Sequence, residues 1–150
     1  MRGFSLLVFF ILALFFVGCG DAKSEASQHN STKCPQCHME VDKTNRYSAK
    51  VETKDEDYVF DDIGCMILYA QKYEIDFSVD ISKVFTKDTQ RFVPIYKARY
   101  KMHERTPMKY GFVAYESRNE MMIEFDEVRL KMLRGEHMAN PKIRKKVLGV

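Results

Sequence analysis

The sequence predicts an α+β domain in which an antiparallel sheet carries helices on one face. Three observations support this class. Polar and apolar residues alternate over residues 46–60, as in half-buried strands. Two later stretches repeat apolar residues at helical spacing behind residues that cap helices. Short β-like runs lie between these stretches, and strands grouped with helices in this way favour an α+β arrangement over a parallel α/β one.

The first half predicts a hairpin followed by a helix. Residues 46–60, RYSAKVETKDEDYVF, contain one alternating strand, a charged turn at KDED and a short return strand at YVF. Asp61 and Asp62 follow, and aspartate is a favourable N-cap residue. Apolar residues then recur at helical spacing, so we expect a helix from about Asp62 to Tyr73.

The second half repeats this order of elements. Further strands are expected at residues 77–81, 83–86, 92–95, 98–102 and 111–115. Ser117 followed by Glu120 is a capping-box signature, which predicts an amphipathic helix from there to about Gly135. Strands followed by a capped helix in both halves suggest two related ββα-type units.

The N-terminus resembles a bacterial lipoprotein signal. A short positive start precedes the uncharged run FSLLVFFILALFFV. A helix that spans a bilayer needs about 20 apolar residues, and this run is shorter. Gly18-Cys19 follows in the manner of a lipobox, although Phe16 stands where leucine is usual. The resemblance implies a signal peptide over residues 1–18 and lipidation of Cys19, and more than one acyl chain anchors a protein stably. Ordinary cleavage that leaves Cys19 free is the alternative.

The expected location is the bacterial cell envelope, as a lipid-anchored membrane protein facing the periplasm.

The remaining chain divides into three parts. Residues 19–33 are small and polar and predict a flexible tether behind the lipidated cysteine. Residues 34–135 form the expected domain. Residues 136–150 form a basic tail, either a frayed end or a contact for anionic lipid heads. Removal of residues 1–18 takes away one arginine and no acid, so the formal net charge falls only from +3 to +2. This near balance argues against nucleic acid as a partner.

The cysteines direct attention to TKCPQCHMEVDK, residues 32–43. With Cys19 lipidated, Cys34, Cys37 and Cys65 remain, and an odd number leaves at least one thiol unpaired unless a metal or a partner takes it. Unpaired thiols outside the cytoplasm are exposed to oxidation. A metal or redox role would explain their presence, although Cys65 also fits a small buried apolar residue.

Several kinds of chemistry are compatible with the CxxC pair. Structural zinc needs four ligands, usually from two such pairs, and only one pair is present. A thioredoxin-like motif opens a helix after a strand, whereas this one precedes the first expected strand. A periplasmic thiol–disulfide redox lipoprotein that uses Cys34 and Cys37 is the main alternative function, and a structural bridge between them is a further one.

A soft monovalent metal uses more of the motif. Thiolate and thioether ligands select Cu(I). If the segment is extended, Cys37 and Met39 project to the same side, two residues apart. One more sulfur would close a trigonal site, and Met108 in TPMKYG is the first candidate, with Met102 and His103 as alternates.

Three segments together resemble the NosL family of lipid-anchored copper chaperones, which is associated with nitrous oxide reductase maturation. They are CPQCHMEV, YVFDDIGCMILYA and TPMKYGFVAYES, in family order. The resemblance implies Cu(I) delivery, in denitrification, to the machinery that assembles the copper centres of nitrous oxide reductase. It places the cysteine-x-methionine element on Cys37 and Met39 and the later methionine on Met108. His38 stands where the family often has glycine, so a ligand role for it is left open. Cys34 is either a second thiolate or a disulfide partner.

We therefore predict a metallochaperone and not an enzyme, because no acid–base pair is placed near CPQCHM. The sequence favours neither a monomer nor a dimer joined by shared copper.

Overall fold

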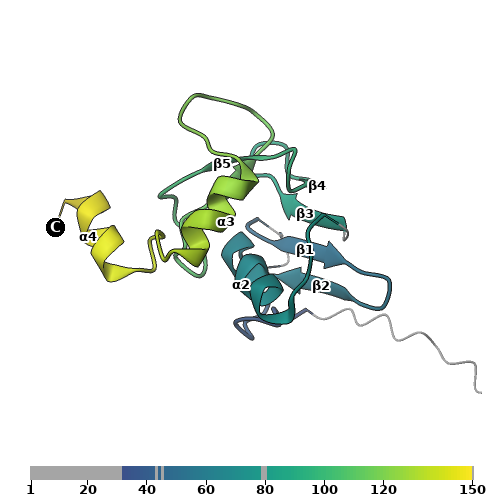
Figure 1. Cartoon of the computed structure of the whole chain (residues 1–150). Coiled ribbons are helices and arrows are strands. Elements are labelled where there is room, and N and C mark those ends of the chain that lie inside the picture. Colours follow the sequence, from purple (N-terminus) through teal and green to yellow (C-terminus); the bar gives the residue numbers. More distant parts are fainter. Residues whose placement is uncertain (1–31, 43, 45, 79–80, 150) are drawn as a thin grey trace, which may run out of the picture.

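The structure is a computed structural model that describes residues 32–149 except 43, 45, 79 and 80. This part of the chain combines helices with antiparallel sheets, which confirms the predicted α+β class (Figure 1). The predicted signal peptide, the lipidation site Cys19 and the tether up to residue 31 lie outside the described residues. The elements in order are β1 (Ala49–Glu52), β2 (Asp57–Phe60), α2 (Ile63–Tyr73), β3 (Ile81–Phe85), β4 (Phe92–Pro94), β5 (Arg99–Lys101), β6 (Val113–Tyr115), α3 (Phe125–Leu133) and α4 (Pro141–Leu148).

A four-stranded antiparallel sheet has the order β2-β1-β3-β4. The predicted hairpin is confirmed, because β1 pairs with β2 and places Ala49 opposite Phe60. On its other side β1 pairs with β3, with Ala49 opposite Val84. These three residues and Val51 are buried, so the alternation seen in the sequence supplies one apolar face of the sheet.

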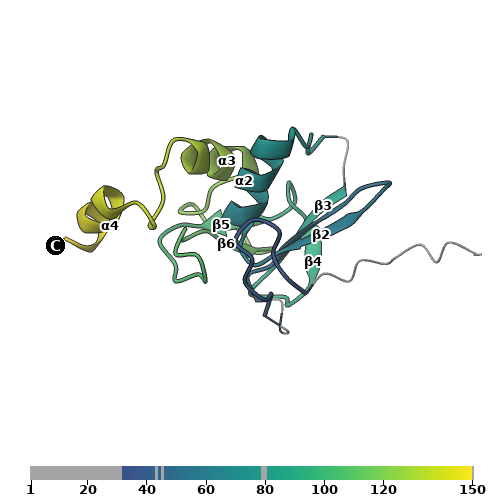
Figure 2. The ribbon, with the colours of Figure 1, turned by 90° about the horizontal axis from the view of Figure 1, so that it is seen from below.

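The helices α2 and α3 lie on the same side of this sheet (Figure 2). Asp62 caps α2 as expected, since its carboxylate accepts a 2.8 Å hydrogen bond from the Gly64 N–H. The helix α3 buries Phe125, whose ring meets Phe77 and Tyr96 edge-on with ring centroids 5.2 Å apart in each pair. The order ββα recurs as β1-β2-α2 and β5-β6-α3.

Two expectations for the second half are wrong. Phe77 lies in a turn, and the strand begins only at Ile81. The helix expected behind Ser117 begins instead at Phe125, after a loop. In that loop Ile123 exchanges two 2.9 Å backbone hydrogen bonds with Tyr100 of β5. Pairing with a distant strand therefore satisfies backbone groups that the local capping pattern would have placed in a helix.

The basic tail is also more ordered than a frayed end. Asn140 caps α4 by accepting a 3.0 Å bond from the Lys142 N–H, Pro141 occupies the first turn, and Gly149 ends the helix in the left-handed conformation. Figures 1 and 2 show that α4 stands apart from the sheets. No helix in the described part of the chain is long and apolar enough to cross a membrane.

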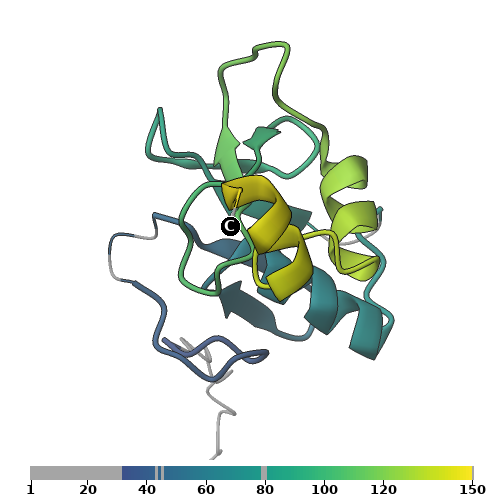
Figure 3. The ribbon, with the colours of Figure 1, turned by 90° about the vertical axis from the view of Figure 1, so that its left-hand side faces the viewer.

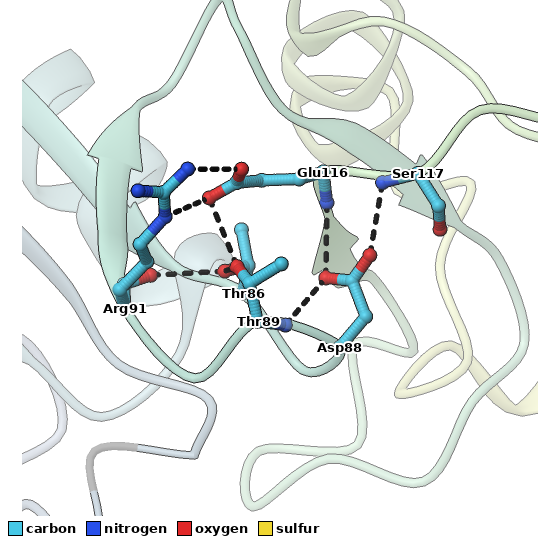
Figure 4. Close-up of polar contacts among 6 residues, drawn as sticks. All are labelled: Thr86, Asp88, Thr89, Arg91, Glu116 and Ser117. Atoms are coloured by element: carbon cyan, nitrogen blue, oxygen red, sulfur yellow. Dashed lines mark hydrogen bonds and ion pairs between the residues drawn. The ribbon is translucent and has the colours of Figure 1, made fainter.

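A polar cluster joins the turn after β3 to the end of β6 (Figure 4). The Asp88 carboxylate accepts hydrogen bonds of 2.9–3.0 Å from the backbone N–H groups of Thr89, Glu116 and Ser117. Arg91 makes two 2.6 Å hydrogen bonds to the Glu116 carboxylate. Asp88 therefore helps to link the two sheets by satisfying backbone donors on both sides, beside the Arg91–Glu116 pair.

Replacement of Asp88 tests this link. Partial burial raises the pKa of Asp88, but the Ser117 and Glu116 amides outweigh it and lower the pKa below its usual 3.8. Stability from a carboxyl of lowered pKa is present above that value and is lost as the pH falls through the folded pKa. We expect Asp88→Asn to lower the free energy of unfolding by about 1 kcal/mol at neutral pH, and the difference to vanish in acid. Urea denaturation across pH measures both. An equal loss in the exposed-turn control Asp55→Asn would contradict the prediction.

Candidate metal site

Three cysteine side chains from two separate segments converge beside the start of α2. Cys34 and Cys37 come from the loop before β1, and Cys65 is the third residue of α2. All three are free thiols, and their Sγ atoms lie within 4.8 Å of one another. Cys34 and Cys65 are fully buried and Cys37 is half-buried. This group could hold a metal ion.

The loop that carries Cys34 and Cys37 folds back on itself. Lys33 and Glu40 form an antiparallel bridge, and inside it the Cys34 N–H donates a 2.9 Å hydrogen bond to the Met39 carbonyl. The His38 N–H donates 2.8 Å to the Cys34 carbonyl, and His38 has a left-handed φ of 62°. The extended geometry predicted for residues 37–39 is therefore wrong, because the chain reverses there.

The exposed end of this loop carries the methionine of the motif. Met39 is 48% exposed, and His38 is exposed as well. Without the extended backbone, the alternation argument for Cys37 and Met39 no longer applies. A ligand role for either Met39 or His38 stays a prediction.

The junction between β2 and α2 holds the loop in place. The chain leaves β2 at Phe60, and the Asp61 backbone N–H donates a hydrogen bond to the Cys34 sulfur. Three residues beyond the cap Asp62, the helix turns Cys65 into the core with no exposed surface. The cysteine cluster is thus assembled on the first turn of a helix whose start is fixed by its own cap.

Hydrogen bonding within the cluster separates the three thiols. The Cys65 thiol donates to the Cys34 sulfur, and this bond lowers the pKa of Cys34 despite its burial. The same bond, together with burial, raises the pKa of Cys65. Burial raises the pKa of Cys37. Cys34 is therefore the first of the three thiols to lose its proton as the pH rises. The cluster then carries one negative charge while Cys37 and Cys65 are still protonated.

Two buried carboxyl groups adjoin the cluster. Burial raises the pKa of Asp61, and the charges of Cys34 and Asp42 raise it further. Burial also raises the pKa of Asp62 to about 6, although Thr106 and the Gly64 amide stabilise its charged form. The buried Asp61 Oδ2 has no hydrogen-bond partner among the residues the structure describes. A cation at the cysteines would offset negative charge that is otherwise costly in this buried place.

The loop TPMKYG reaches the same place. Met108 is half-buried, and its backbone N–H interacts with the Asp62 carboxyl. The Tyr110 ring lies against Gly64, where an added Cβ would overlap it. Burial raises the pKa of Tyr110 to about 12, and the nearby charges of Cys65 and Asp62 add to this shift. The structure therefore brings all three sequence motifs to the start of α2.

The two alternate ligands predicted from the sequence lie elsewhere. Met102 is half-buried against the core, and His103 is exposed at the end of β5 with a left-handed φ of 63°. No described contact joins either residue to the cysteines. The sequence left Cys65 open between a functional thiol and a small buried apolar residue, and the structure places it in the cluster. Its signal was the odd cysteine count together with a position one turn behind a capped helix start.

The donor set limits which metals fit. A metal with sulfur ligands at about 2.3 Å holds their sulfur atoms no more than about 4.6 Å apart, close to the spacing here. Three thiols favour thiophilic ions such as Cu(I) or zinc over Mg²⁺ or Ca²⁺, which take oxygen ligands. The arrangement is therefore suited to a soft metal of low coordination number.

Comparison with known proteins adds no relative to this description. No protein-family model, no curated protein and no solved structure matches the chain.

Gly64 tests how closely the Tyr110 loop packs on the site. A Cβ at Gly64 would overlap the Tyr110 ring and come within 2.8 Å of the Met132 terminal methyl. We expect Gly64→Ala to lower the free energy of unfolding by about 1–3 kcal/mol, although alanine is the better helix former. In a Tyr110→Ala background the same change should be neutral or stabilising. Urea denaturation of the four proteins in this double-mutant cycle measures the coupling. A cost for Gly64→Ala that is equal in both backgrounds would refute the predicted contact.

Proposed function

We propose that the protein binds one Cu(I) ion through Cys34, Cys37 and Cys65 and carries it to a copper enzyme. The convergence of three free sulfur atoms from two segments is the observation that carries the proposal. Cys34 contributes the first thiolate, and the other two thiols lose their protons as the metal binds.

Copper suits this site better than zinc. Structural zinc takes four ligands, and the described cluster supplies three thiols. The nearest additional acid groups, Asp61 and Asp62, are harder ligands than sulfur, and Asp62 is already engaged as a helix cap. Cu(I) accepts a three-sulfur environment, so the cysteines alone satisfy it.

The graded exposure of the cluster suits a carrier. Cys34 and Cys65 are buried, whereas Cys37 is half-buried and Met39, in the same loop, is 48% exposed. A partner can therefore approach the metal from the Cys37 side without unfolding the core. Met39 is a soft donor on that side and would serve as an entry ligand, with Met108 as the predicted donor from the neighbouring loop.

The destination follows from the resemblance to the NosL family. Under this proposal Cys19 is lipidated, the protein faces the periplasm, and the recipient is the machinery that assembles the copper centres of nitrous oxide reductase. Copper transfer to that machinery, followed by the copper content of the reductase, tests the destination separately from copper binding.

One observation favours the redox alternative. Three sulfur atoms this close, one of them with a lowered pKa, also satisfy the first requirement of a thiol–disulfide couple. The two functions differ in their need for Cys65. A couple between Cys34 and Cys37 requires only those two residues, whereas the proposed copper site requires all three.

An anaerobic Cu(I) titration against a chromogenic chelator tests the proposal. The protein begins at Gly20, which retains every described residue, and is fully reduced. We expect one tightly bound Cu(I), and a loss of more than about 100-fold in affinity for each of Cys34→Ser, Cys37→Ser and Cys65→Ser, because each removes a direct ligand. Met39→Leu should weaken Cu(I) binding less than the cysteine variants do. Its larger effect should be on the rate of copper transfer, which it should slow.

A matched methionine variant controls for nonspecific effects. Met121 is 75% exposed in the loop before α3, so Met121→Leu should leave affinity and transfer unchanged. Unaltered copper affinity in Cys65→Ser would contradict the three-thiolate site. If that variant also kept a reversible Cys34–Cys37 disulfide, the redox function would replace the copper function.

A further inference from the structure

The C-terminal helix α4 presents an unusual surface that the metal site does not use. It has eight residues, PKIRKKVL, and none of them is buried. Four are cations and none is an acid. Val147 and Leu148 are 38% and 58% exposed. Caps at both ends stabilise this helix, and its side chains remain available to a partner.

The cations are arranged around an apolar stripe. Ile143 and Val147 are four residues apart and share one face of the helix. Arg144 and Lys146 flank that face, each roughly 60° around the helix axis from its nearer apolar neighbour. Long basic side chains beside apolar ones can extend their charges outward while the apolar side chains insert into a lipid surface.

The positive charge of α4 is not used within the protein. Lys142, Arg144, Lys145 and Lys146 are exposed, and none forms an ion pair with another residue in the described ranges. A cluster of cations is complementary to anionic lipid headgroups, and each contributes to binding near such a surface. An acidic protein surface would match the charge but would not need the adjacent exposed apolar residues.

We propose that α4 is an interfacial helix that docks on an anionic lipid surface, with Ile143 and Val147 inserted and the four cations among the headgroups. This function requires neither a bound metal nor a lipid on Cys19. A single short helix binds a membrane weakly and reversibly, so it orients the protein on the surface instead of retaining it there.

The segment before α4 transmits this orientation to the domain. The Met138 N–H donates a 3.1 Å hydrogen bond to the Tyr110 carbonyl, and the His137 ring meets the Tyr110 ring edge-on at 5.1 Å. Met138 also packs on Gly111, which has a left-handed φ of 91° and no room for a Cβ. The helix is thus joined to the loop that contacts Gly64 at the metal site, although it projects from the body (Figure 1) and lies in front of it in the view of Figure 3.

Vesicle binding tests the proposal directly. The reduced, metal-free protein beginning at Gly20 is mixed with vesicles of phosphatidylcholine alone or with phosphatidylglycerol added, and bound protein is separated by flotation. We expect binding to the anionic vesicles to be more than about tenfold stronger and to weaken with added salt. The combined variant K142Q/R144Q/K145Q/K146Q should lose at least about tenfold of this binding.

A charge-matched variant separates the helix from overall charge. It replaces four exposed basic residues outside α4 by glutamine, namely Lys54, Lys72, Lys97 and Arg118. This variant has the same net charge as the α4 variant. Because attraction to the lipid surface depends on local charge, it should bind anionic vesicles within about twofold of the unaltered protein. Equal losses in the two variants would overturn the proposal, as would equal binding to neutral and anionic vesicles.

Fluorescence tests the insertion of the apolar residues. The chain contains no tryptophan, so Val147→Trp introduces a single reporter. We expect its emission to shift to the blue with anionic vesicles only, while Tyr73→Trp, at an exposed position on α2, shows no shift. Polyglutamate is the comparison for an acidic protein partner. Binding to polyglutamate as strong as to the vesicles, with no blue shift at residue 147, would assign the surface to an acidic protein and overturn the lipid proposal.

Discussion

The contact between Cys34 and Cys65, whose sulfur atoms lie within 4.8 Å of each other in the core, is the interaction on which the architecture around the site depends. It joins the loop before the first strand to the first turn of α2, and both sulfur atoms are fully buried. The Asp61 amide donates to the same Cys34 sulfur, so the loop is held from two neighbouring positions of the β2–α2 junction.

This interaction also couples the chemistry of the site to its fold. The cluster lies beside Asp61 and Asp62, and burial makes negative charge unfavourable at both. Negative charge on the cysteines adds to this cost, because it lies close to the two buried carboxyl groups. A soft cation would offset this negative charge. Its binding would also release protons from the thiols, so the number of protons released would measure metal binding.

Sequence reasoning succeeded where local signals and tertiary packing agree. The hairpin and the Asp62 cap were predicted because alternation and capping chemistry act within a few residues. The second helix was misplaced because Ile123 pairs with Tyr100, a contact that no local pattern encodes. At the site, Cys34 and Cys37 were found from their spacing. Their union with Cys65 depends on how the loop packs on α2, which neither residue's neighbours in the sequence specify.

The left-handed backbone at His38 has a consequence for how this loop tolerates change. A histidine at φ 62° stores conformational strain on the order of 1 kcal/mol, and a glycine in the same place stores none. The left-handed backbone at the chain reversal, and not the imidazole, therefore determines which residues fit at this position. The loop geometry therefore limits residue 38 to side chains that can adopt a positive φ, and it should exclude above all those branched at Cβ.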